Sequence, residues 1–180
     1  MINAALNPLQ GNTKADAIPV IGSQNFTGTE NLLAKLGNNS GTPNLYPVAG
    51  LTDKAVYIVM SGDIQGNVTW VQVPSPGEQC RLRAYGTGSA GDRIILADPS
   101  ANSGAQTGMV RSLTGSQAPT AGGKYFRFGI AEENFVNGQT VLARFIPGDE
   151  TISTSFTASG TEATDIAAIK TILEANGIIT

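Results

Sequence analysis

The pattern of apolar and polar positions changes near residue 51. From there onward, short β-branched runs alternate with turn residues at intervals of roughly 10 to 15 residues, which is the spacing of a small barrel or sandwich. The runs cover residues 56–60, 68–73, 81–85, 93–97 and 107–113. Clusters of Gly, Pro and Asp between them supply turns. The pattern therefore predicts a mainly β core domain, a small β-barrel or β-sandwich, over residues 51–149.

The densest apolar feature is a predicted hairpin over residues 124–147. Each of its two strands alternates between an apolar and a more polar face, and the connecting residues 132–138 contain an Asn-Gly pair that accepts positive φ. Six side chains on the apolar face are expected to point into the core: Phe126, Phe128, Ile130, Val141, Ala143 and Phe145.

Residues 1–50 show little periodicity, because prolines interrupt the pattern. We interpret them as an extended N-terminal arm with one short helix over residues 29–37, which begins at a capping Thr29 and stops at Gly37. Apolar side chains are scattered along this arm, as is rare in a disordered linker, so the arm is expected to lie on its own domain, a neighbouring copy or another protein. The candidate partner contacts are Leu6, Leu9, Ile18, Val20 and Phe26.

Residues 150–180 form an acidic C-terminal segment. Residues 152–156 alternate weakly and are expected to add an edge strand. Ser159 and Glu162 have the spacing of a capping box, and Ile166, Ile169 and Leu173 then recur along one face. The spacing predicts an α-helix over residues 161–176, which needs a surface on which to dock.

Composition excludes several classes of function. The 180 residues contain no His, so the usual general base and zinc ligand are missing, and the single Cys80 has no second Cys with which to pair. We expect no enzymatic activity, no metal and no cofactor, and we interpret Cys80 as a small buried residue. The net charge of −3 arises entirely in residues 150–180, so there is no broad basic surface and nucleic acid is not an expected partner. No apolar run is long enough to span a bilayer, and we expect no membrane association.

Three motifs have both a structural and a functional interpretation. Residues 86–91 match the dinucleotide fingerprint GxGxxG, but a predicted strand follows where a helix is required, which favours a plain hairpin loop. Basic and aromatic side chains are expected on one face of the sheet: Arg81, Arg83, Tyr85, Tyr125, Arg127 and Arg144. Such a face would suit the stacking of single-stranded bases. The alternative is a solvated or protein-contacting face on which the arginines pair with nearby acids. Trp70, in the middle of a strand, is interpreted as a core or interface anchor.

Four stretches carry a resemblance to a known family: residues 46–50, RLRAYG at 81–86, GDRIILA at 91–97 and the hairpin at 124–148, which includes Phe128-Gly129-Ile130-Ala131. Over residues 46–148 the chain resembles the head decoration (capsid cement) proteins of tailed bacteriophages. The resemblance implies a non-enzymatic virion protein, made in the host cytoplasm, that binds the outer surface of an icosahedral capsid. It also implies contacts with the major capsid protein and with sister copies, most often in a homotrimer, that bridge capsomers and stabilise the head. The alternative is a ligand- or carbohydrate-binding β module, such as a phage fibre or receptor-binding domain.

Overall fold

The structure, a computed structural model, describes residues 17–115, 123–151, 166, 167 and 169–171. Its first unit is a closed barrel in the strand order β1-β3-β2-β4-β5. The barrel strands are β1 (Ile18–Gly22), β2 (Leu33–Asn39), β3 (Thr42–Pro47), β4 (Tyr57–Ser61) and β5 (Val68–Gln72). β1 closes it, because β1 pairs in parallel with β3 and antiparallel with β5.

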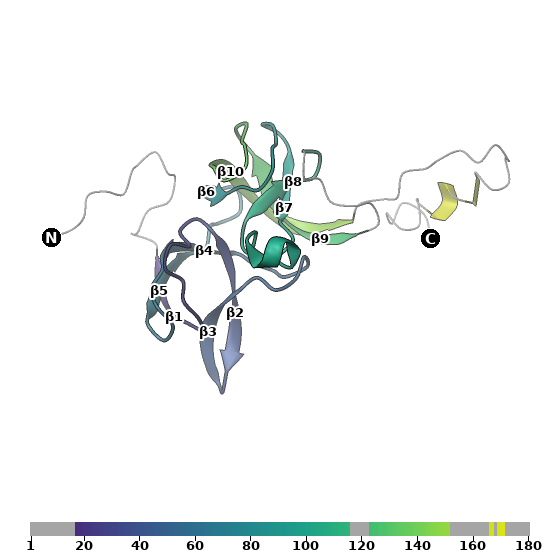
Figure 1. The fold of residues 1–180 in the computed structure, drawn as a ribbon. Helices are drawn as coiled ribbons and strands as arrows, with labels where there is room; N and C mark the ends of the chain where they lie inside the picture. Colours follow the sequence, from purple (N-terminus) through teal and green to yellow (C-terminus); the bar gives the residue numbers. More distant parts are fainter. Residues whose placement is uncertain (1–16, 116–122, 152–165, 168, 172–180) are drawn as a thin grey trace.

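The second unit is a five-stranded sheet in the order β6-β10-β9-β7-β8 beside the barrel (Figure 1). Its strands are β6 (Gln79–Arg83), β7 (Arg93–Leu96), β8 (Val110–Ser112), β9 (Lys124–Ala131) and β10 (Thr140–Thr151), and a 3₁₀ turn, η3 (Ala101–Gly104), precedes β8. The two edges of this sheet approach each other, since Ala84 forms a parallel bridge with Val110. The expectation of a mainly β protein is confirmed, and the predicted hairpin corresponds to β9 and β10.

The described part of the N-terminal segment is not an extended arm. Residues 18–47 supply three of the barrel strands, and the predicted helix over residues 29–37 is wrong because most of that range lies in β2. Asn31 has a φ of 65°, which a continuing right-handed helix does not accept. Two short turns precede β2, in which Thr29 N–H donates to the Phe26 carbonyl and Leu32 N–H donates to the Thr29 carbonyl. The predicted boundary at residue 51 therefore falls between two strands of one barrel.

One wall of the barrel also belongs to the second core. Leu33 is buried against side chains of the second sheet, whereas the next residue, Ala34, is buried inside the barrel. The paired strand β4 repeats this division, with Ile58 in the shared core and Val59 in the barrel core. Because successive side chains of a strand point to opposite faces, β2 and β4 join the two units through a common hydrophobic core.

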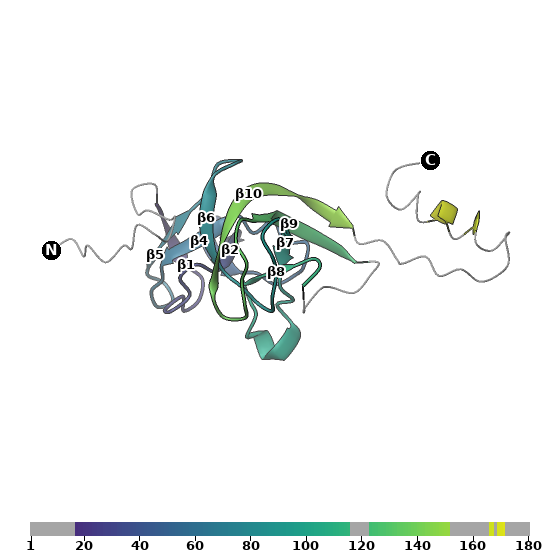
Figure 2. The same ribbon diagram turned by 90° about the horizontal axis from the view of Figure 1, so that it is seen from above.

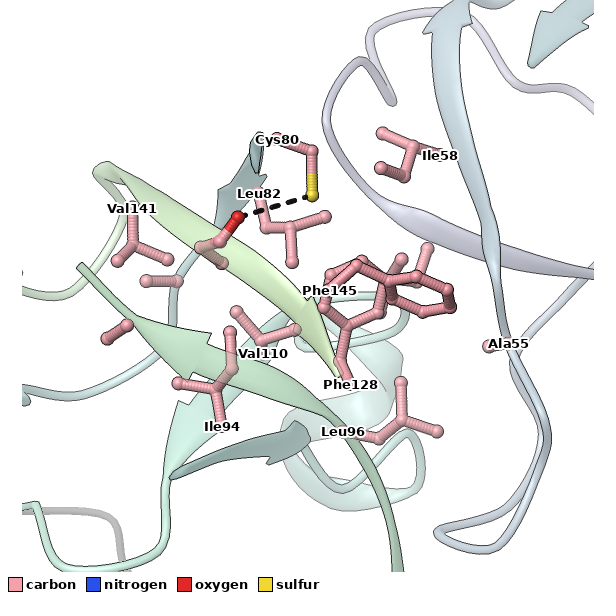
Figure 3. Close-up of a cluster of buried hydrophobic side chains, with 14 of the residues drawn as sticks. Ala55, Ile58, Cys80, Leu82, Ile94, Leu96, Val110, Phe128, Val141 and Phe145 are labelled. Atoms are coloured by element: carbon pink, nitrogen blue, oxygen red, sulfur yellow. Dashed lines mark hydrogen bonds between the residues drawn. The ribbon is translucent and has the colours of Figure 1, made fainter. Parts of the chain in front are cut away.

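The hairpin supplies the phenylalanine side chains of that core. Five of the six predicted residues are buried, and the rings of Phe128 and Phe145 lie 4.9 Å apart between their centroids (Figure 3). The sixth, Ile130, is only half-buried and lies on the outer face, so its prediction is wrong. The register of β7 against β9 skips Phe128, because adjacent residues of β7 pair with Gly129 and Arg127. Such a bulge places two successive residues on one face and reverses the alternation beyond them.

The expected edge strand at residues 152–156 lies wholly outside the described residues. The first 16 residues of the predicted arm, with Leu6 and Leu9, also lie outside them. Within the predicted C-terminal helix, residues 166, 167 and 169–171 are described, and they are helical.

Candidate docking surfaces

The predicted partner contacts lie in different environments. Ile18, at the start of β1, has 48% of its surface exposed, whereas Val20 is half-buried against the barrel core. Phe26 is buried in the barrel core and is not part of an exposed surface. Leu6 and Leu9 are not among the described residues.

Pairing of β1 with β5 places apolar side chains side by side on the outside of the barrel. Pro19 lies opposite Trp70, and Ile21 lies opposite Val68, while the intervening Thr69 points inward and is buried. Trp70 has 41% of its surface exposed. We call the outward-facing side chains of these two strands the apolar strip: Pro19, Ile21, Val68 and Trp70.

Local contacts fix the position of the strip. The turn before β5 is tied to the end of β1, because Gly22 N–H donates to the Asn67 carbonyl at 3.0 Å and Gly66 N–H donates to the Gly22 carbonyl at 2.9 Å. Neither strand contains a charged residue. A contiguous, uncharged apolar surface of this kind is typical of a protein-contacting site. Sequence reasoning had marked Trp70 as a core or interface anchor and Ile21 as one of the apolar side chains that need a surface. It missed Val68, whose only signal was alternation within its own short run.

A cavity of about 210 Å³ lies between the barrel and the segment that leads into β8. Its walls are mostly apolar, with Phe26, Leu32 and Met109 among them, and the side chain of Arg83 adds a charged group. The segment is held close to β2, since Leu33 N–H donates to the Gly108 carbonyl at 2.7 Å. Gly108 has a φ of 76°, and a Cβ there would lie 2.5 Å from the Leu33 carbonyl oxygen, so a larger residue would push this wall away.

Arginines of the basic sheet face pair with acids in the described part of the chain. Arg81 pairs with Glu133, and Arg127 pairs with Glu150 at 2.6 Å. Tyr125 is buried, so its ring is not free to stack on a base. The prediction that arginines on this face pair with nearby acids is confirmed for these two.

A further pair, Arg144 with Glu132, lies on the same face. A hydrogen bond from the Arg144 guanidinium lowers the pKa of Glu132, and the same bond raises the pKa of Arg144. Both groups therefore stay ionised over the ordinary pH range, as a stable surface ion pair requires.

The GxGxxG motif forms the connection between β6 and β7. Gly88 bridges Phe135 of the β9–β10 loop, and a Cβ on Gly88 would lie 2.4 Å from the Phe135 ring. Two side-chain amides join the same loops, with Gly86 N–H donating to Asn137 and Ala90 N–H donating to Asn134. The glycines serve loop packing, and the prediction that a strand follows the motif is confirmed by β7. The loop is not a hairpin loop, because β10 and β9 lie between β6 and β7 in the sheet.

Titratable groups in the described residues do not form a metal site. Among those residues no group of three or more His, Cys, Asp or Glu side chains is placed to hold a metal ion. Cys80 is fully buried beside the Ala143 carbonyl, and burial raises the pKa of its thiol to about 12. Its interpretation as a small buried residue is confirmed. No described helix has both the length and the apolar character to cross a bilayer.

Comparison with known proteins finds a similar fold but no related sequence. The sequence matches no protein-family model and no curated protein. Among solved structures, it is similar to the N base of the head fiber protein gp8.5 of bacteriophage phi29, with 15% sequence identity and a TM-score of 0.52. The similarity covers 72% of this chain and 92% of that one. The two chains therefore share a fold.

Proposed function

We propose that this chain is a non-enzymatic structural protein of a phage virion that binds the outer surface of an icosahedral head through the apolar strip. The observation that carries the proposal is the strip itself, an exposed and uncharged apolar surface centred on Trp70. Two features support the assignment to a phage head. The fold is similar to that of the base of a phage head fiber, and the hairpin and the Gly-Asp motif resemble those of capsid decoration proteins.

The strip also suits a role in bridging capsomers. Residues 1–16 lead directly into β1, so the predicted contacts Leu6 and Leu9 precede the strip in the chain. A segment of that length spans up to roughly 50 Å when extended, at about 3.3 Å per residue. We propose that the strip docks on one major capsid protein subunit and that the N-terminal residues contact a neighbouring one, which stabilises the head. The bound form is proposed to be a homotrimer.

Binding to heads tests this proposal. Heads of the phage that encodes this chain, prepared without it, would be titrated with the purified wild-type protein or with Trp70→Ser. Removing a central aromatic anchor typically costs about 2 kcal/mol or more, so we expect the affinity to fall at least tenfold. Val136→Ser, a change of an exposed apolar residue in the loop between β9 and β10, is the matched control and should bind as wild type. Equal binding of wild type and Trp70→Ser, with both folded, would remove the strip from the proposal.

The exposed indole also supports a second candidate, a ligand- or carbohydrate-binding module of a phage fibre. Aromatic rings at binding surfaces serve as rigid contact platforms. Trp70 is the single tryptophan of the chain, so its intrinsic fluorescence reports directly on a sugar placed against it. Saturable quenching by cell-surface oligosaccharides, together with unchanged head binding by Trp70→Ser, would favour this candidate.

A further inference from the structure

Arg83 differs from its neighbours on the outer face of the second sheet. Arg81 and Arg144 each pair with a glutamate of the β9–β10 loop. Arg83 has no carboxylate within ion-pair distance among the residues that the structure describes, and it makes one long hydrogen bond of 3.5 Å to the Gly28 carbonyl. Its guanidinium therefore keeps most of its donors available beside the cavity that it lines.

The size and lining of the cavity restrict what can occupy it. Its volume of about 210 Å³ is below the roughly 300 Å³ at which small-molecule sites begin, so it suits one inserted side chain. Phe26 and Val59 in its lining are buried, whereas Ala105, on the segment that leads into β8, is exposed. An apolar wall with an available guanidinium matches an aliphatic side chain close to a carboxylate, the combination that anchors many peptides.

The acidic C-terminal segment of this chain has that composition. All of the excess negative charge lies in residues 150–180, and Glu162 and Asp165 precede two isoleucines spaced three apart. In the described helical residues, Ile166 and Ile169 are exposed by 59% and 43%. Residues three apart lie on the same face of a helix, so the two isoleucines are presented together.

The direction in which β10 leaves the sheet favours a second copy as the source of this segment. β10 ends at Thr151, at the end of the molecule that points away from the barrel (Figure 2), whereas the cavity borders the barrel. We propose that the cavity beside Arg83 binds the C-terminal segment, residues 161–176, of a neighbouring copy of this chain, with an isoleucine in the cavity and a carboxylate on the guanidinium. This mode of self-association does not depend on binding to a phage head.

A peptide titration tests the proposed site. The receptor is the full chain with Ile166→Ser and Ile169→Ser, so that its own segment cannot compete, and the probe is a fluorescein-labelled peptide of residues 161–176. We expect saturable binding by fluorescence anisotropy that weakens at least tenfold in a receptor that also carries Arg83→Gln or, independently, Ala105→Trp, which fills the mouth of the cavity. Arg93→Gln removes a more exposed guanidinium that is paired with Glu150, and it should leave binding unchanged.

Two further measurements separate the occupants. A peptide with Glu162→Gln and Asp165→Asn should bind more weakly, and binding of the original peptide should weaken as salt rises. In sedimentation, the wild-type chain should associate with increasing concentration, and Arg83→Gln should not. Circular dichroism confirms that each variant is folded. Absence of peptide binding, or binding that Arg83→Gln and Ala105→Trp leave unchanged, would overturn the site. Peptide binding by a chain that stays monomeric at all concentrations would assign the cavity to the chain's own segment and overturn the second copy.

Discussion

Truncation of Leu33 tests whether the barrel and the second sheet form one cooperative unit. Leu33 belongs to a barrel strand, but its side chain is 2% exposed and contributes to the core that both units share. Replacing a buried leucine by alanine costs about 2 to 5 kcal/mol, because the transfer free energy is lost and a cavity remains. Leu36→Ala is the matched control in the same strand, where 40% of the side chain is exposed, and its expected cost is under about 1 kcal/mol.

Two natural probes report on the two units separately. The single Trp70 lies on the barrel, and the single Cys80 lies inside the second sheet. Cys80 is fully buried, with a thiol pKa raised by burial to about 12, so a thiol reagent modifies it only after the sheet opens. Urea unfolding is followed by Trp70 fluorescence and, at the same urea concentrations, by a short pulse of thiol labelling.

The expected result is one transition seen by both probes. With a urea m-value of about 1 to 3 kcal/mol per molar, Leu33→Ala should lower both midpoints together by roughly 1 M or more. If the fluorescence midpoint falls while the Cys80 midpoint stays at its wild-type value, the two units fold separately. That outcome would refute the shared core and make the second sheet an independently folding unit.

Two further variants probe local packing and pH dependence. Gly88→Ala should lower the free energy of unfolding by about 1 to 3 kcal/mol in urea melts, because the added Cβ overlaps the Phe135 ring. Adding Phe135→Leu to Gly88→Ala should recover part of that loss. Additive effects of the two substitutions would contradict this contact. Burial raises the pKa of Asp53, but the Lys35 ammonium and two backbone N–H groups outweigh burial and hold that pKa below its ordinary value. Because the folded pKa is the lower one, this stabilisation is full above the unfolded value of about 3.9 and is lost as pH falls through the folded pKa. In urea melts, Asp53→Asn should therefore destabilise the protein at pH 7, and its cost should shrink as the pH falls below about 3.9. A loss that does not change with pH would exclude the ion pair as its cause.

The strands after residue 51 were predictable because their information is local. Alternation within five or six residues is sufficient to specify a strand with one buried face, and the hairpin of β9 and β10 adds a turn that its own residues specify. The bulge at Phe128 made the predicted inward orientation of Ile130 wrong, because the bulge depends on the register of a different strand, β7. The glycine-rich loop was likewise predictable, since the strand pattern that follows it excludes a nucleotide cradle.

The N-terminal half of the barrel and the docking surfaces required the tertiary structure. β1 pairs with β5, some fifty residues later, so its run of five residues carries no local sign of its partner. The helix signals at residues 29–37 were outweighed because Leu33 and Ala34 face two different cores. The sequence by itself determined a mainly β chain whose excess negative charge lies in residues 150–180. Only the fold brought Ile21 beside Val68 and left Arg83 without a carboxylate among the described residues, because both relations depend on which distant strands become neighbours.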